Sequence, residues 1–289
     1  MKQYLYLLRP HQWLKNIFVF APIFFSNNLL NGELLVPTLF TFFAFCFISS
    51  SIYCYNDLKD VESDRHHPQK CKRPIASGAV SIRAAYFMMA LCLLISAFFL
   101  FRINHFILYL LLMLYWLMNV AYSVILKRYA IVDIIVIAIG FVLRVLAGGI
   151  ATEIWVSEWL VLMTFLLAIL LALTKRYDDF SVYEHTGTKP RISITGYNKV
   201  FINQSTAIIG SITMVCYIMY TMSLEVIDRL NSRYLYLTCI WVLMGLLRYL
   251  QMMLVYEKSN SPTKSLLTDN FIHICVSGWV ISFFVIIYL

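Results

Sequence analysis

Long apolar stretches separated by polar connections dominate the chain. Nine of them are nearly free of charged residues and approach the roughly 20 residues that a helix needs to cross a hydrocarbon core. They span residues 16–31, 35–56, 84–101, 104–126, 129–151, 157–174, 200–224, 234–255 and 270–289. Helices are expected, because an open sheet edge in lipid leaves backbone groups unpaired. The pattern predicts an all-α integral membrane protein with nine transmembrane helices, forming a single polytopic membrane domain over residues 1–289.

The composition agrees with a lipid environment. Apolar residues make up 61% of the 289 residues and charged residues only 13%, with a mean hydropathy of +0.76. An ordinary soluble domain carries about 25% charged residues, and its surface needs them. Seven cysteines include no CxxC pair, and all but Cys71 lie in apolar stretches. We therefore expect core hydrophobes rather than a disulfide framework or a metal knuckle.

The basic residues are distributed unevenly between the connections. The net charge is +8, and 18 of the 23 lysines and arginines lie on the side of the amino terminus if nine spans alternate. The positive-inside rule then places the amino terminus and the long connections 57–83 and 175–199 in the cytoplasm, with the carboxyl terminus on the far side. This asymmetry explains the charge without a nucleic-acid partner.

The connection after the second stretch holds the most distinctive polar residues. If the helix continues, four oxygen-bearing side chains fall within about 100° of one face. They are Asn56, Asp57, Asp60 and Asp64. Carboxylates at this spacing repel one another, and oxygen ligands favour Mg²⁺, which also binds substrate phosphates. The alternative is a solvated helix end whose acids pair with neighbouring lysines.

The segment NDLKDVESDRHHPQKCKRPIASG, residues 56–78, resembles the first motif of the UbiA superfamily of intramembrane prenyltransferases, NDxxDxxxD followed by a lysine and Arg-Pro. The resemblance covers essentially the whole chain and implies a nine-helix bundle with a cytoplasmic polar cap. It implies that Asn56, Asp60 and Asp64 hold Mg²⁺ on a diphosphate, with Asp57 assisting catalysis. By the same resemblance, Lys70 and Arg73 bind phosphate oxygens.

The connection after the sixth stretch departs from the pattern of the aromatic prenyltransferases in this superfamily. Those enzymes repeat an acidic motif there, DxxxD, for a second Mg²⁺. This chain has the sequence KRYDD over residues 175–179, and no carboxylate follows Asp179 by four residues. The adjacent cations Lys175 and Arg176 suit phosphate neutralisation, although such a pair just past a span is often only a positive-inside anchor.

Three segments resemble one branch of the superfamily, the decaprenyl-phosphate phosphoribosyltransferases: RPHQWLKN at 9–16, GFVLR at 140–144 and KRY at 175–177. The resemblance implies transfer of phosphoribose from phosphoribosyl pyrophosphate to a polyprenyl phosphate, at the cytoplasmic side of a bacterial inner membrane, for a cell-wall precursor. A heavily anionic donor needs many cations. The candidate cations are Arg9, Lys15, Lys70, Arg73, Lys175 and Arg176. Further candidate substrate-binding residues are Asn16, Tyr122, Lys127, Asp133 and Tyr177.

Two other functions compete with this interpretation. An aromatic-substrate polyprenyltransferase using a prenyl diphosphate would share the first acidic motif, and the absent second motif disfavours it. A transporter or lipid carrier is disfavoured because the acids crowd one end of the spans. Arg144 lies within a span, where a long basic side chain can snorkel to the interface. The sequence leaves open the role of Arg144, the isoprenoid length, the number of Mg²⁺ ions and the oligomeric state, with which a homo-oligomer is compatible.

Overall fold

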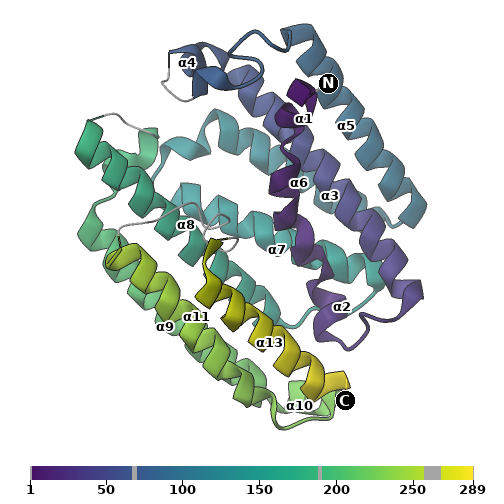
Figure 1. Cartoon of the computed structure of the whole chain (residues 1–289). Helices are drawn as coiled ribbons and strands as arrows, with labels where there is room; N and C mark the ends of the chain where they lie inside the picture. The colour runs from purple at the N-terminus through teal and green to yellow at the C-terminus, as the bar shows by residue number, and fades with distance from the viewer. Residues whose placement is uncertain (1, 67–69, 188–190, 257–267, 289) are drawn as a thin grey trace. The chain divides into compact units, whose positions relative to one another are not determined.

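The computed structural model describes residues 2–66, 70–187, 191–256 and 268–288, and all regular secondary structure in these ranges is helical (Figure 1). Eight described helices are long and apolar enough to cross a membrane. They are α3 (Gly32–Lys59), α5 (Ile82–Ile103), α6 (Phe106–Val124), α7 (Val132–Thr152), α8 (Glu158–Thr186), α9 (Lys199–Met222), the helical segment Leu235–Leu254 made of η5 (Leu235–Thr238) and α11 (Cys239–Leu254), and α13 (Asn270–Tyr288). The prediction of an all-α, multi-span membrane protein is confirmed.

The predicted count of nine spans is not confirmed, because the first stretch, 16–31, is not one continuous helix in the structure. A 3₁₀ helix, η1 (Pro10–Phe20), leads into a short α-helix, α2 (Ala21–Phe25), and a turn follows. A short helix, α1 (Lys2–Leu8), precedes them. The 3₁₀ form rarely exceeds 3–4 residues on its own, so the eleven residues of η1 depend on packing against their neighbours.

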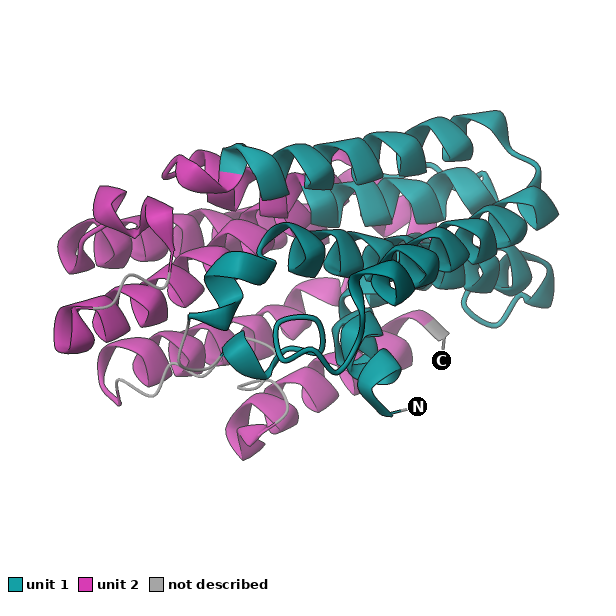
Figure 2. Cartoon of the chain, turned by 90° about the horizontal axis from the view of Figure 1, so that it is seen from above, with its two compact units in different colours: residues 1–126, 140–156 teal, residues 127–139, 157–289 magenta. Residues whose placement is uncertain are grey.

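Two compact units make up the chain (Figure 2). Unit 1 contains residues 1–126 and 140–156, and unit 2 contains residues 127–139 and 157–289. The long helix α7 therefore contributes its first residues to unit 2 and the remainder to unit 1. The single domain over residues 1–289 stays a prediction.

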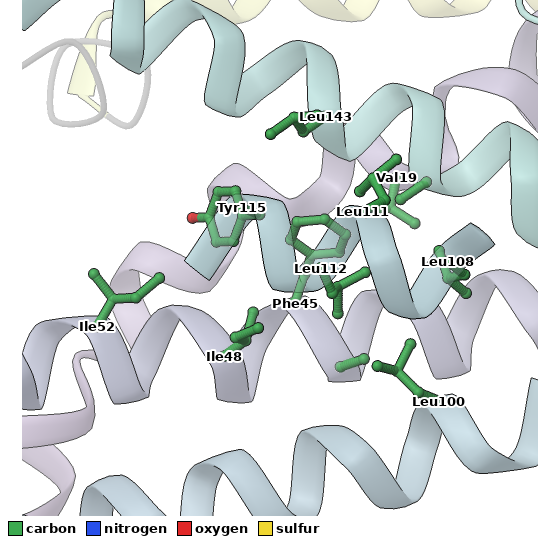
Figure 3. Close-up of a cluster of buried hydrophobic side chains, with 12 residues drawn as sticks. Val19, Phe45, Ile48, Ile52, Leu100, Leu108, Leu111, Leu112, Tyr115 and Leu143 are labelled. Carbon is green, nitrogen blue, oxygen red and sulfur yellow. The ribbon is translucent and has the colours of Figure 1, made fainter. Parts of the chain in front are cut away.

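Unit 1 is organised around α3, which runs beside α5 and packs against η1 and α6 (Figure 1). The helix begins where the Asn31 side chain accepts a hydrogen bond from Glu33 N at 3.0 Å, a standard N-cap. Its buried face contributes to an apolar core shared by η1, α3, α5, α6 and α7. Figure 3 shows the labelled members of this core: Val19, Phe45, Ile48, Ile52, Leu100, Leu108, Leu111, Leu112, Tyr115 and Leu143.

Unit 2 pairs α8 with α9 and α11 with α13. Side-chain caps set where its helices begin: Ser157 accepts from Leu160 N before α8, and Asn198 accepts from Phe201 N before α9. The predicted sixth span stops at residue 174, but α8 continues to Thr186. The KRYDD segment, 175–179, consequently lies on a helix rather than in a connecting loop.

Candidate functional site

An acidic cluster lies in unit 1 where α3 ends and the short helix α4 (Val61–Arg65) begins. The expected continuous helix is interrupted at Asp60, whose backbone leaves the helical region at φ −95° and ψ 6°. The four-residue hydrogen-bond spacing nevertheless persists, because Asp60 N donates to Asn56 O at 3.0 Å and Asp64 N donates to Asp60 O at 2.8 Å. Asn56, Asp60 and Asp64 therefore stand on successive turns, as the sequence predicts.

Two arginines bridge the acids of this cluster. Arg9 Nη2 lies 2.5 Å from Asp57 Oδ1, and Arg73 Nη1 lies 3.1 Å from the same oxygen. Arg73 Nη1 also lies 2.6 Å from Asp64 Oδ2. Asp57 and Asp64 are only 2% and 3% exposed, whereas Asn56 and Asp60 are half-buried. The structure thus brings together the predicted cations Arg9 and Arg73 and the predicted acids.

The two carboxylate oxygens of Asp57 have different surroundings. Asp57 Oδ2 is buried, and no residue in the described part of the chain hydrogen-bonds to it. A buried carboxylate oxygen without a partner is costly, and a cation or a donor group relieves that cost. The oxygen-only donor set and this orphaned oxygen fit Mg²⁺. Within the described ranges, no group of three or more His, Cys, Asp or Glu side chains is arranged to hold a metal ion. The predicted set combines one amide with two carboxylates and stays a prediction.

The backbone that presents Arg9 is unusual. Arg9 lies between α1 and η1 with φ 52° and ψ 57°, a left-handed conformation that costs an ordinary residue about 1 kcal/mol or more. Its guanidinium also lies 4.9 Å from the centroid of the Tyr53 ring. Surrounding contacts therefore hold this turn in a conformation that the local sequence disfavours.

The other predicted residues of unit 1 lie on different elements and differ in burial. Lys70 lies in η2 (Lys70–Lys72), and its carbonyl accepts from Arg73 N at 2.9 Å. Lys15 is half-buried on η1, and Tyr122 is half-buried near the end of α6. Asn16 is completely buried and donates from Nδ2 to Cys46 Sγ at 3.3 Å.

Arg144 is not among the predicted site residues, but it contacts one of them, Asn16. It does not snorkel: it is only 7% exposed, and its Nε donates to Asn16 Oδ1 at 2.7 Å. The only sequence signal is a basic residue inside an apolar span, and this signal does not distinguish a side chain that snorkels to the interface from one that is enclosed.

Unit 2 holds a second polar cluster, centred on Asp133 at the start of α7. Asp133 is 1% exposed and accepts from Arg176 Nε at 2.8 Å, Ser193 Oγ at 2.9 Å and Tyr197 OH at 2.6 Å. Burial, followed by the hydrogen bond to Asp133, raises the pKa of the Tyr197 hydroxyl, so it is a protonated donor at neutral pH. The predicted substrate-binding residue Asp133 thus has its acceptor oxygens committed to protein donors.

The adjacent cations on α8 have different surroundings. Arg176 is completely buried, and its Nη1 lies 3.4 Å from Asp179 Oδ2, which also accepts from Arg191 Nε at 2.7 Å. Arg176 Nη2 is buried and has no hydrogen-bond partner within the described ranges. Lys175 is half-buried. The charge of Arg176 is therefore already balanced by two carboxylates, with one nitrogen left to donate.

The remaining predicted residues of unit 2 are Tyr177 and Lys127. Tyr177 is buried in a small core with Tyr197, Ile202 and Met253. Lys127 is half-buried in η3 (Leu126–Arg128). Ser193 and Tyr197 are not among the predicted site residues, because hydroxyl groups in a predicted connection carry no sequence signal of a buried partner.

Comparison with known proteins identifies relatives along most of the chain. The sequence profile of the UbiA prenyltransferase family matches residues 18–274. The decaprenyl-phosphate phosphoribosyltransferase of Mycolicibacterium smegmatis is 29% identical over 283 residues, covering 94% of this chain and 88% of that protein. The enzyme of the same name from Mycobacterium tuberculosis is 32% identical over 220 residues, covering 73% and 70% of the two chains.

Solved structures share the fold. A UbiA homologue from Archaeoglobus fulgidus, bound to GPP and Mg²⁺, has a TM-score of 0.73 at 19% sequence identity and covers 99% of this chain and 100% of that chain. The apo structure of a UbiA homologue from Aeropyrum pernix has a TM-score of 0.66 at 15% identity, covering 94% and 97%. At these identities the likeness establishes the helical architecture.

Proposed function

The chain belongs to the UbiA prenyltransferase family of membrane transferases, and we propose that it transfers 5-phosphoribose from phosphoribosyl pyrophosphate to a polyprenyl phosphate, releasing pyrophosphate. The observation that carries the proposal is the cluster in which Arg9 and Arg73 bridge Asp57 and Asp64. The names of the relatives with 29% and 32% identity support the choice of donor and acceptor. The missing second DxxxD motif supports it further.

The cations of unit 1 suit a pyrophosphate leaving group. Arg9 and Arg73 donate hydrogen bonds to carboxylate oxygens in the structure, and a guanidinium can donate in the same way to phosphate oxygens. We assign phosphate contacts to them, with Lys15 and Lys70 as further cations and Asn16 and Tyr122 as residues of the donor site.

The residues that would hold Mg²⁺ are Asn56, Asp60 and Asp64, with Asp57 assisting. When bound, the ion supplies charge neutralisation at the leaving pyrophosphate. The family includes a solved homologue with Mg²⁺ bound. The unpartnered Asp57 Oδ2 is the observation in this chain that fits such an ion.

The proposed transfer of phosphoribose requires little acid–base catalysis by the protein. The bond between ribose C1 and the pyrophosphate oxygen breaks, and a bond forms between C1 and an oxygen of the lipid phosphate. Because that phosphate is already ionised at neutral pH, no general base is needed. Arg9 and Arg73 act by hydrogen bonding to the negative charge that develops on the pyrophosphate.

Residues of unit 2 are proposed as donor-site residues on the strength of the sequence resemblance. They are Lys127, Asp133, Lys175, Arg176 and Tyr177. The chain is a multi-pass membrane protein. We propose that its active site faces the cytoplasm across a bacterial inner membrane, because the positive-inside rule favours that orientation.

The second candidate function is an aromatic-substrate polyprenyltransferase, since a prenyl diphosphate also fits the acidic cluster of Asp57 and Asp64. A paired assay separates the two. Purified protein with Mg²⁺, phosphoribosyl pyrophosphate and polyprenyl phosphate is expected to release pyrophosphate and form lipid-linked phosphoribose. A prenyl diphosphate with 4-hydroxybenzoate is expected to give no prenylated phenol. Product in the second assay alone would replace the proposal with the second function.

A further inference from the structure

Arg144 is a buried cation in α7, within a membrane-spanning segment of unit 1. All its hydrogen bonds go to neutral acceptors, each at 2.7 Å: Nε to Asn16 Oδ1, Nη1 to Gly140 O and Nη2 to Tyr115 OH. Three aromatic rings surround the guanidinium, those of Phe45, Tyr115 and Phe141. No ion pair among the described residues includes Arg144. Burying a charged side chain inside a membrane span costs free energy, and such residues are usually functional.

Asn16 connects Arg144 to the amino-terminal segment. Both polar atoms of its side chain have a partner: Oδ1 accepts from Arg144, and Nδ2 donates to Cys46 Sγ at 3.3 Å. Asn16 is the only completely buried polar residue of η1. The asparagine therefore ties η1 to α7 on one side and to α3 on the other.

The 3₁₀ form of η1 explains why its contacts fall in one line. A 3₁₀ helix repeats every three residues, so Trp13, Asn16 and Val19 share a face. Trp13 Nε1 donates to Ser50 Oγ at 3.1 Å, and Val19 enters the apolar core shown in Figure 3. Gly148, one turn after Arg144 on α7, has no room for a Cβ because the Val19 carbonyl lies against it. The rotation of η1 is thus set by successive contacts along one face.

Arg9 stands at the start of this same segment. Asn16 lies seven positions after Arg9, a rise of about 14 Å along a 3₁₀ helix at roughly 2.0 Å per residue. Ser50 Oγ donates to Leu8 O at 2.8 Å, which fixes the chain just before Arg9. The strained turn at Arg9 then directs its guanidinium to Asp57. A rotation of η1 about its axis moves Arg9 away from that carboxylate.

We propose that Arg144 is a positioning residue: through Asn16 it fixes the rotation of η1 and so directs Arg9 at the acidic cluster. The inference rests on the proposed function for its kinetic consequence, because Arg9 is assigned to the donor phosphates. Arg144 itself touches neither acid. Its cost as a buried cation is offset by the neutral acceptors and ring faces that hold it.

The first experiment is a double-mutant cycle on donor kinetics. Arg144→Gln is expected to raise KM for phosphoribosyl pyrophosphate about tenfold with a smaller change in kcat, as expected for loss of one charge-assisted contact. In the Arg9→Gln background, Arg144→Gln is expected to add little, because the contact it positions is already gone. An equal effect in both backgrounds would show a general structural role and overturn the proposal.

Two variants serve as controls. Tyr115→Phe removes the acceptor of Arg144 Nη2 but keeps the hydrogen bond of Arg144 to Asn16, so it is expected to keep KM for the donor near the wild-type value. The matched arginine is Arg102, which is exposed near the end of α5. Arg102→Gln is expected to change neither KM for the donor nor kcat. If Arg144→Gln does not fold, Asn16→Leu replaces it in the arginine-modification experiment described next, and an Arg9 modification rate equal to that of Tyr115→Phe would overturn the proposal.

The second experiment needs no turnover, so it still decides the positioning role if the proposed reaction fails. Phenylglyoxal modifies arginine side chains, and mass spectrometry of the peptide containing Arg9 measures its rate. The ion pair with Asp57 protects Arg9 from modification. Arg144→Gln is therefore expected to accelerate the modification of Arg9 several-fold, whereas Arg102→Gln is expected to leave that rate unchanged. An unchanged rate in Arg144→Gln would overturn the inference. If wild-type protein is inactive with the donor but Arg144→Gln still accelerates the modification of Arg9, only the proposed reaction is refuted.

Discussion

Arg176 and Asp133 form an ion pair that is removed from solvent: Nε lies 2.8 Å from Oδ2, and the side chains are 0% and 1% exposed. A buried pair of this kind is sensitive to the loss of either member, because the remaining charge is left without compensation. The neighbouring Lys175 is only half-buried. Two adjacent cations that look equivalent in the sequence therefore have different surroundings.

This difference predicts opposite outcomes for two substitutions. Arg176→Ala is expected to lower the free energy of unfolding by about 3–5 kcal/mol, since Asp133 loses its cation. Lys175→Ala is expected to leave the fold intact and to raise KM for the donor. Thermal unfolding in detergent together with donor kinetics checks both, and Arg128→Ala, at an exposed position, is the control. A wild-type melting midpoint for Arg176→Ala would show that the ion pair with Asp133 does not stabilise the fold.

The acidic cluster predicts metal dependence. Asp60→Asn and Asp64→Asn are each expected to reduce turnover by about 100-fold or more, because a metal ligand neutralises and orients the leaving group. Glu62→Gln is the matched control, since Glu62 is exposed and, among the described residues, forms an ion pair only with the neighbouring Arg65, at 3.4 Å. Circular dichroism confirms folding in each variant. Undiminished activity in excess EDTA would remove the metal from the mechanism.

Two glycines on α7 predict contrasting effects of the same substitution. A Cβ at Gly148 would overlap the Val19 carbonyl oxygen, so Gly148→Ala is expected to destabilise the protein by about 1–3 kcal/mol. A Cβ at Gly140 would make only ordinary contacts at 3.6–3.7 Å, so Gly140→Ala is expected to be neutral or stabilising by up to about 1 kcal/mol. The shift in melting temperature measures both. Equal shifts would show that η1 does not rest against Gly148.

The charge asymmetry predicts the orientation in the membrane. Cys71 is partly exposed in the connection that we assign to the cytoplasm. An impermeant maleimide added to intact cells is expected to leave it unlabelled, and permeabilisation is expected to expose it. Trp155→Cys, at a 70% exposed position between α7 and α8, is expected to be labelled from outside. Mass spectrometry assigns each label, and labelling of Cys71 in intact cells would reverse the topology.

The sequence determined the features that depend on neighbouring positions. Runs of apolar residues long enough for a bilayer predict membrane helices, and eight such helices are found in the described chain. The four-residue spacing of Asn56, Asp60 and Asp64 predicts successive helical turns, and the backbone hydrogen bonds follow that spacing even across the break at Asp60. These properties follow from helical periodicity and need no knowledge of packing.

Tertiary structure alone decided which distant residues meet. Arg144 and Asn16 are 128 residues apart in the chain, and Arg176 and Asp133 are 43 apart. No local pattern distinguishes a basic residue that snorkels from one that is enclosed, because the difference lies in what the neighbouring helices offer. The 3₁₀ form of η1 is likewise a product of packing, since the isolated segment has too few stabilising contacts to hold it. Helical periodicity specifies a face, and only the packing of helices specifies the partner of that face.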